Sequence, residues 1–199
     1  AIGNVGSTAQ HDDVNRNSGV SIKLSALSCR FATRYWMNSR DDLIRRVCAL
    51  AVDARRYNIP VTIDAEECAR LQPSLDVFES VLRHPDLRAW NGLGMVIQAY
   101  ARHADAVVDR LEALARTHQI RISVRLVKGA YWDTEIKLAQ EKGLADFPVY
   151  TAKNHTDLAY LALAKRLMNA SRYVHPQFAS HNAYTLCAVS ALAAAIGPE

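Results

Sequence analysis

The sequence predicts an α/β fold in which parallel strands alternate with helices. Short apolar runs alternate with segments of helical periodicity along all 199 residues, and polar residues follow the carboxyl end of each apolar run. Such alternation favours parallel pairing through helical crossovers. Half of the residues are hydrophobic, which is enough for one core and too little for two domains. We therefore expect one domain over residues 1–199.

The first strand is expected at 20–27, an apolar run that contains Lys23. A helix should follow over 39–58, because apolar residues recur there at spacings of four and three. This stripe is formed by Leu43, Val47, Leu50, Ala54 and Tyr57. Acidic residues open the segment and basic residues close it, as the helix dipole favours.

The next strands are expected at 60–64, which a proline opens, and at 93–100. A helix around 74–83 should separate them. A further helix is predicted over 103–118, with its inward face formed by Val107, Val108, Leu111 and Leu114.

The fourth strand is expected at 121–130, followed by a helix that Asp133 caps and that ends near Gly143. A helix over 155–168, a strand over 176–180 and an Ala-rich packed helix over 183–196 complete the order. Residues 144–155 are irregular, and we interpret them as a functional loop.

An open doubly wound sheet and a closed (βα) barrel share this pattern. No GxGxxG follows any strand, so the dinucleotide fingerprint of the first is missing. Polar residues at five successive strand ends favour the second, because barrel enzymes place their sites where these ends converge. We predict a fold of the (βα)8 TIM-type barrel family, present as a partial barrel of about five parallel strands.

Several classes of protein are excluded by composition. The net charge of +4 comes from dispersed residues, so no nucleic-acid surface is expected. No apolar run approaches the roughly 20 residues of a membrane span, and no secretory signal is evident. The four cysteines are dispersed, which favours a reducing cytoplasm over disulfides or zinc. The chain starts without methionine, which indicates either ordinary trimming of the N-terminus or a piece of a longer protein.

The polar strand ends indicate a ligand. Lys23 should pair with Asp64 on a neighbouring strand, since an unpaired ammonium in a strand is costly. Arg125 and Lys128 should face opposite sides of their strand, and Gly129 permits a close backbone approach. Cations and exposed N–H groups suit phosphate or a delocalised negative charge.

Further residues extend this interpretation. The Gln98 amide suits the edge of a heterocycle. Tyr131 and Trp132 offer flat surfaces, although either could simply cover the end of the barrel. Asn182 should cap the last helix, and His181 could donate to a phosphate. No second histidine lies at ligand spacing, so no metal site is expected.

A family resemblance follows from "VSIKLSAL", "IDAEE", "GLGMVIQAY", "VRLVKGAYWDTEIKLAQEKGL", "FPVYTAK" and "HPQFASHNAYTL". In this order they resemble the proline dehydrogenase domain of the bifunctional bacterial proline-utilisation flavoproteins. The resemblance implies a (βα)8 barrel that holds FAD at the carboxyl ends of its strands. It implies oxidation of L-proline to Δ1-pyrroline-5-carboxylate by hydride transfer from C5 to the flavin N5, with a membrane quinone as acceptor.

By the same resemblance, cofactor contacts fall on Gln98, Arg125, Val127, Lys128, Gly129, Ala130, Trp132, Thr151, Lys153, His181 and Asn182. The proline pocket falls on Lys23, Asp64, Ala130 and Tyr131, and the catalytic role on Lys23, Asp64, Tyr131 and Arg125. The resemblance also implies a cytoplasmic protein, peripheral at the inner membrane and homo-oligomeric at full length.

There are departures from the family pattern. Ser28-Cys29-Arg30-Phe31 stands where the family has His-Pro-Arg-Tyr, Ser180 where it has Thr, and Ala152 where it has Arg. The matched strands correspond to the second to sixth of the barrel. The first strand, the last two strands and the final helix, whose arginines hold the proline carboxylate, have no counterpart. We therefore expect this chain alone to bind FAD weakly or not at all, and not to turn over proline.

Two alternatives stay open. One is an inactive or incomplete fragment. The other is a Schiff-base barrel lyase that uses Lys128 or Lys23.

Overall fold

Five parallel strands form one open sheet, and their order in the sheet follows their order in the chain. The computed structural model describes residues 11–31 and 35–197. The strands are β1 (Val20–Ile22), β2 (Val61–Ile63), β3 (Leu93–Gln98), β4 (Ile122–Val127) and β5 (Val174–Phe178). A doubly wound sheet would reverse its strand order at a switch point, and this sheet does not. The predicted partial barrel with five parallel strands is confirmed.

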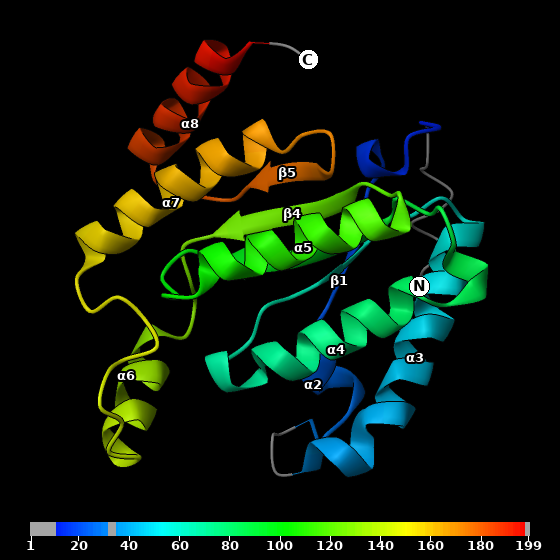
Figure 1. Cartoon of the computed structure of the whole chain (residues 1–199), viewed down its shortest axis with the longest axis horizontal. Helices are drawn as coiled ribbons and strands as arrows, with labels where there is room; N and C mark the ends of the chain where they lie inside the picture. The colour runs from blue at the N-terminus through cyan, green and yellow to red at the C-terminus, as the bar shows by residue number, and fades with distance from the viewer. Residues whose placement is uncertain (1–10, 32–34, 198–199) are drawn as a thin grey trace.

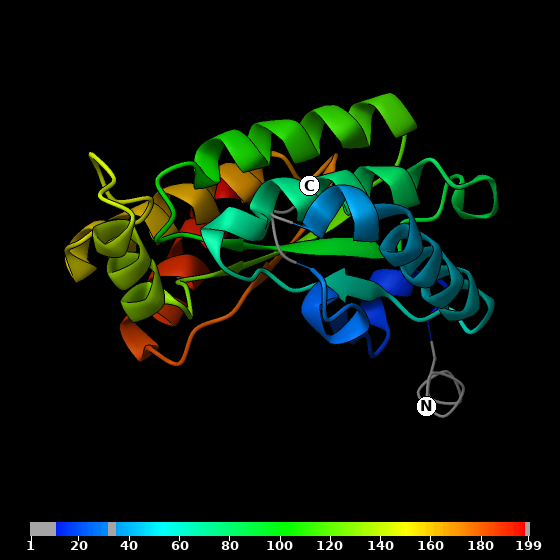
Figure 2. The same ribbon diagram turned by 90° about the horizontal axis from the view of Figure 1, so that it is seen from below.

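Helices connect successive strands. They are α2 (Leu24–Leu27), α3 (Trp36–Arg56), α4 (Leu71–Leu82), α5 (Ala104–His118), α6 (Trp132–Glu141), α7 (Lys153–Asn169) and α8 (Ala183–Ile196). Within residues 11–31 and 35–197, short 3-10 helices are η1 (Val14–Arg16), η3 (Cys68–Arg70) and η4 (Pro85–Leu87). Figure 1 shows the arrows of β4 and β5 pointing toward the side of the molecule where α6 and the start of α7 lie. Figure 2 shows α4 and α5 on the same face of the sheet.

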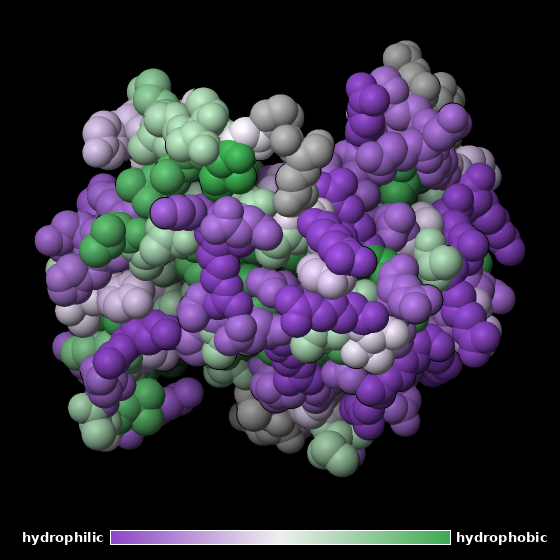
Figure 3. Space-filling model, turned by 45° about the horizontal axis from the view of Figure 1, so that its top comes forward, coloured by the Kyte–Doolittle hydropathy of each residue, from purple (hydrophilic) through white to green (hydrophobic). Residues whose placement is uncertain are grey.

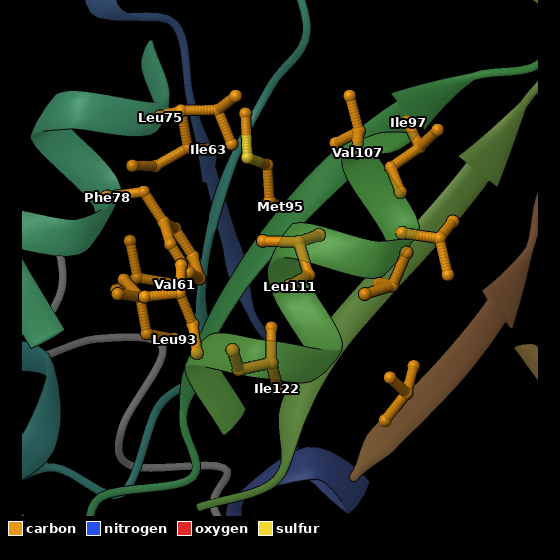
Figure 4. Packing of buried hydrophobic residues seen from close by; sticks show 14 of the residues in the cluster. Val61, Ile63, Leu75, Phe78, Leu93, Met95, Ile97, Val107, Leu111 and Ile122 are labelled. Atoms are coloured by element: carbon orange, nitrogen blue, oxygen red, sulfur yellow. The ribbon is translucent and has the colours of Figure 1, made fainter. Parts of the chain in front are cut away.

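The core lies between the sheet and its covering helices. Side chains of β2, β3, α4 and α5 point toward one another there (Figure 4). All six residues of the central strand β3 are buried, whereas β1 and most of β5 are only partly buried. Burial of apolar surface is the main stabilising contribution, so the central strands are the most strongly held part of the sheet.

Two predicted elements differ from the structure near the N-terminus. The expected strand over 20–27 ends at Ile22, because the chain turns at Lys23 into α2 and buries Leu24 completely. The predicted stripe of α3 is correct at Leu43, Val47 and Ala54. It is wrong at Tyr57, which follows the last residue of the helix and is 48% exposed.

The second half of the chain differs from the predicted elements at three points. Tyr131, not Asp133, occupies the N-cap position of α6, and the Asp133 side chain lies in the first turn. The irregular segment 144–155 includes an antiparallel bridge between Ala101 and Val149, and α7 already begins at Lys153.

The Ala-rich helix α8 is formed as predicted, but it is not packed on all sides. Of its residues only Thr185 and Val189 are buried, while Tyr184, Leu186 and Ile196 are exposed. Its main contacts are with α7, so one side of the helix is covered. Figure 3 shows apolar side chains gathered at the upper left, where Figure 1 places α8. Among the described helices, none is long and apolar enough to cross a membrane.

Candidate active site

The carboxyl ends of the strands open onto a cleft of about 1000 Å³. Most of the residues predicted for the site line this cleft. They are Lys23, Asp64, Gln98, Arg125, Val127, Lys128, Gly129, Ala130, Tyr131, Lys153, His181 and Asn182. Thr151 and Trp132 do not line it, and the Trp132 indole N–H donates to the carbonyl of Tyr150 at 2.9 Å. The sheet therefore brings together residues that are up to about 160 positions apart in the sequence.

Arg125 and Asp64 form an ion pair across the central strand. Arg125 lies on β4 and Asp64 directly follows β2, so the pair reaches over β3 between them. The Arg125 guanidinium also donates to the Ser21 hydroxyl of β1 at 2.8 Å. Both charged side chains are only about a quarter exposed, at 28% and 23%. The pair thus places a charged group of each sign on the floor of the cleft.

Lys23 has a different partner from the one predicted. Its ammonium donates to the Tyr131 hydroxyl at 3.3 Å, and Asp64 is instead paired with Arg125. Because β1 ends at Ile22, Lys23 is exposed at the mouth of the cleft, and its charge is not buried in the sheet as the sequence suggested. The contact with Tyr131 raises the pKa of Lys23, and the nearby Asp64 and Glu66 carboxylates raise it further. Lys23 is therefore cationic at neutral pH.

Lys128 reaches away from Arg125, toward α7. Its ammonium pairs with the Asp157 carboxylate, which Lys153 also approaches at 2.7 Å. The hydrogen bonds from Lys128 and then Lys153 lower the pKa of Asp157. Arg125 and Lys128 were expected to face opposite sides of their strand, but both line the same cleft, because Lys128 lies just beyond the end of β4. They differ in their ion-pair partners, which are Asp64 and Asp157.

The loop after β4 passes close to the ring of Tyr100. Gly129 has φ of 139°, and a Cβ atom there would lie 2.5 Å from this ring. The next residue, Ala130, donates its N–H to the Gln98 side-chain oxygen at 3.1 Å, while the Gln98 amide donates to the Glu66 carbonyl at 2.9 Å. The predicted role of Gly129 in close backbone approach is confirmed. Gln98 thus connects the loop after β4 with the segment after β2 through the two ends of its amide.

The end of β5 contributes the polar edge of the cleft. His181 and Asn182 both line it. The Asn182 side chain accepts from the Thr185 N–H at 3.0 Å, so the predicted cap of α8 is confirmed. His181 is exposed at this position.

Glu135 supports the site and was missed by sequence reasoning. This side chain in the first turn of α6 is only 4% exposed, and its carboxylate accepts the Cys68 N–H at 2.5 Å. Cys68 follows the segment that carries Asp64, so Glu135 connects that segment to the helix that begins next to Tyr131. Burial, and then the Glu135 carboxylate, raises the pKa of the Cys68 thiol to about 12. Acidic residues are common in the first turn of a helix, so the sequence offered little reason to single out Glu135. The one available signal was that Glu135 lies on the same helical face as Ala139, which is buried.

Comparison with known proteins agrees with this geometry. The sequence model of the family described as "Proline dehydrogenase" matches residues 1–199. The chain is 46% identical over 193 residues to "Bifunctional protein PutA" of Klebsiella aerogenes, which covers 97% of this chain and 15% of that protein. It is 28% identical over 134 residues to "Proline dehydrogenase 2" of Bacillus subtilis, which covers 67% of this chain and 38% of that protein.

Solved structures give the same result. A crystal structure of proline utilization A (PutA) from Bradyrhizobium japonicum matches with a TM-score of 0.94 at 44% identity, over 97% of this chain and 20% of that one. The PutA of Bdellovibrio bacteriovorus, inactivated by N-propargylglycine, matches with a TM-score of 0.88 at 29% identity, over 98% of this chain and 21% of that one. The chain spans about 15% of the length of the PutA proteins it matches. It belongs to the proline dehydrogenase family.

Proposed function

We propose that this chain is the barrel core of an FAD-dependent enzyme that oxidises L-proline to Δ1-pyrroline-5-carboxylate, the first step of proline catabolism to glutamate. Membership of the family supports the reaction. The observation that carries the proposal is the Arg125–Asp64 ion pair beside the Lys23–Tyr131 contact, in one cleft at the carboxyl ends of the strands. Barrel enzymes place their catalytic groups at this end.

The residues of the cleft fit a flavin dinucleotide. Arg125 and Lys128 supply cations, and the backbone at Gly129 lies at the same edge, next to Ala130, whose N–H is held by Gln98. Cations and backbone N–H groups are the donors that bind phosphates and a negatively charged ring. Arg125, Val127, Lys128, Gly129 and Ala130 would hold the cofactor, together with Gln98, Lys153, His181 and Asn182. Bound there, the flavin would supply a two-electron acceptor for the hydride at C5 of proline.

The chain's own side chains bind and orient the substrate in this proposal. Asp64, which pairs with Arg125, offers a carboxylate that can accept the N–H of proline. Lys23 stays charged because its pKa is raised by Tyr131. Its positive charge at the mouth attracts the substrate carboxylate. Tyr131, whose hydroxyl accepts from Lys23, lines the pocket and would shield one side of the bound substrate from water, which would strengthen these electrostatic interactions.

The acceptor and the assembly follow from the family resemblance alone. In this proposal a membrane quinone receives the electrons. The protein works in the cytoplasm and attaches peripherally to the inner membrane, and its full-length form is a homo-oligomer.

Titration of FAD into the chain tests the binding part of the proposal. Flavin fluorescence should reveal weak, saturable binding, and Arg125→Met should weaken it about tenfold or more, because a charge-assisted contact contributes roughly 1.5–3 kcal/mol. Arg40→Gln, which removes the same charge from an exposed position of α3, is the matched control and should leave binding unchanged. Equal affinities for Arg125→Met, Arg40→Gln and the unaltered chain would refute the assignment.

The Schiff-base alternative is disfavoured by the state of the two lysines. An amine must be neutral to attack a carbonyl, whereas Lys128 is ion-paired with Asp157 and the pKa of Lys23 is raised. Borohydride treatment with a carbonyl substrate should therefore give no adduct. A lysine adduct at either position, found by mass spectrometry, would replace the flavin proposal with a lyase.

A further inference from the structure

A second cleft, of about 590 Å³, lies at the opposite end of the sheet. Its residues directly precede the strands. Arg121 comes before β4 and Tyr173 before β5, while Arg116 lies in the last turn of α5. None of the residues assigned to the proline and flavin cleft lies here. The proposed function therefore gives no reason for its composition.

Two guanidinium groups share one aromatic ring in this cleft. The Arg116 guanidinium lies 4.7 Å from the centre of the Tyr173 ring, and that of Arg172 lies 5.5 Å from it. Such cation–π contacts hold an arginine in place without neutralising its charge. Arg121, the third cation, donates through Nε to the Val174 carbonyl at 3.1 Å. This bond orients the Arg121 guanidinium and likewise leaves its charge unbalanced.

Carboxylates balance only part of this charge. Glu112 pairs with Arg116 at 3.3 Å, and Arg166, which also lies 3.6 Å from Glu112, has its own partners in Asp105 and Asp109. Within the described part of the chain, Arg121 and Arg172 have no ion-pair partner. Like charges gathered in this way repel one another, so an anion with more than one charge would be bound favourably.

The neighbouring His175 also senses the charge of Arg121. Burial lowers the pKa of this imidazole and the Arg121 guanidinium lowers it further, while the Asp13 carboxylate offsets part of this effect.

We infer that this cleft binds a compact anion of the diphosphate class. Arginine forks match two phosphate oxygens at once, which favours phosphate over a simple halide or a single carboxylate. The cluster is confined to one cleft, and basic residues elsewhere are dispersed, which disfavours an extended nucleic acid. A free pyrophosphate and the diphosphate of a nucleotide share this chemistry, and the ligands used in the test distinguish them.

Calorimetric titration of the chain with inorganic pyrophosphate, orthophosphate and ADP tests the inference. Pyrophosphate should bind about tenfold more tightly than orthophosphate, since it meets more of the guanidinium groups. Tighter binding of ADP than of pyrophosphate would identify a nucleotide site, and equal or weaker binding a site for the free anion. The absence of saturable pyrophosphate binding would overturn the inference.

Substitutions locate the binding. Arg172→Gln should weaken pyrophosphate binding about tenfold, and Arg172→Lys should recover part of it, because lysine keeps the charge and loses the fork. Arg172 is exposed, so the fold should survive, and circular dichroism checks this. Arg116→Gln is a second variant, and its loss should be smaller because Glu112 already pairs with Arg116. Arg40→Gln, the matched exposed arginine on α3, should bind pyrophosphate as the unaltered chain does. Equal binding by Arg40→Gln and Arg172→Gln would contradict the site.

The proposed anion site and the proposed flavin site can be tested independently of each other. Arg125→Met should retain pyrophosphate binding while it loses FAD binding, because Arg125 lies at the other end of β4 from Arg121. Loss of pyrophosphate binding in Arg125→Met would mean that the anion occupies the flavin cleft, which would overturn this inference and leave the proposed function standing.

Discussion

Helices α5 and α8 are both rich in apolar residues, yet they are buried to very different extents. The apolar side of α5 is buried against β3 and β4, whereas most of α8 is exposed and its main contact is α7. Figure 1 shows α5 lying along the sheet and α8 beyond β5 at its margin. Position relative to the sheet, and not apolar content, therefore decides how much each helix contributes to stability.

The largest expected effect tests the buried side of this comparison. Leu111 of α5 is completely buried. Leu111→Ala should lower the free energy of unfolding by about 2–5 kcal/mol, since it removes buried methyl groups and leaves a cavity. Urea denaturation followed by circular dichroism measures the change. A loss below about 1 kcal/mol would mean that α5 is not held against the sheet as described.

The next largest change in stability concerns the hydrogen bond between Glu135 and Cys68, next to the candidate site. Glu135→Ala leaves the Cys68 N–H without its acceptor and should cost about 1–3 kcal/mol, the usual cost of an unpaired buried polar group. Glu135→Gln keeps an acceptor oxygen and should cost less. Asp133→Ala, in the same turn of α6 but exposed, is the control and should change little. Equal losses for Glu135→Ala and Asp133→Ala would remove the supporting role from Glu135.

A smaller effect should appear at acid pH, in the dependence of the free energy of unfolding on pH. The pKa of Asp157 is lowered in the folded chain by Lys128 and Lys153. The contribution of ionised Asp157 to the free energy of unfolding is therefore complete above the unfolded pKa of about 4. It is lost as the pH falls below that value. Lys128→Met should flatten this part of the profile by up to about 1 kcal/mol, because the pair is partly exposed. An unchanged acid limb in Lys128→Met would show that the pair does not couple folding to pH.

The smallest expected change in stability concerns the exposed helix α8. Leu186 of α8 is 42% exposed. Leu186→Ala should change the free energy of unfolding by no more than about 0.5 kcal/mol, as is usual for surface positions. The same urea experiment compares it directly with Leu111→Ala. A loss as large as that of Leu111→Ala would mean that α8 is buried against another surface in solution.

The sequence predicted what depends on local pattern. The helical stripe of α5 and the strand order followed from periodicity and alternation, and the Gly129 break followed from the chemistry of glycine. The family itself followed from motifs such as "RLVKGAYWD". Partners across the sheet could not be predicted in this way. Asp64 pairs with Arg125 because both reach across β3, and no spacing in the sequence records that distance. The exposure of α8 was missed for a related reason, since an apolar helix does not indicate what lies beside it.

Visible absorption of the protein expressed from its complete gene shows directly whether the cleft at the carboxyl ends of the strands holds a flavin. If Arg125, Lys128 and the loop after β4 hold a flavin beside a proline pocket, the protein should be purified yellow, and L-proline should bleach the flavin bands. Arg125→Met should lose flavin or slow the bleaching, and Arg40→Gln should do neither. A colourless protein, or a bound flavin that L-proline does not reduce, would contradict the account.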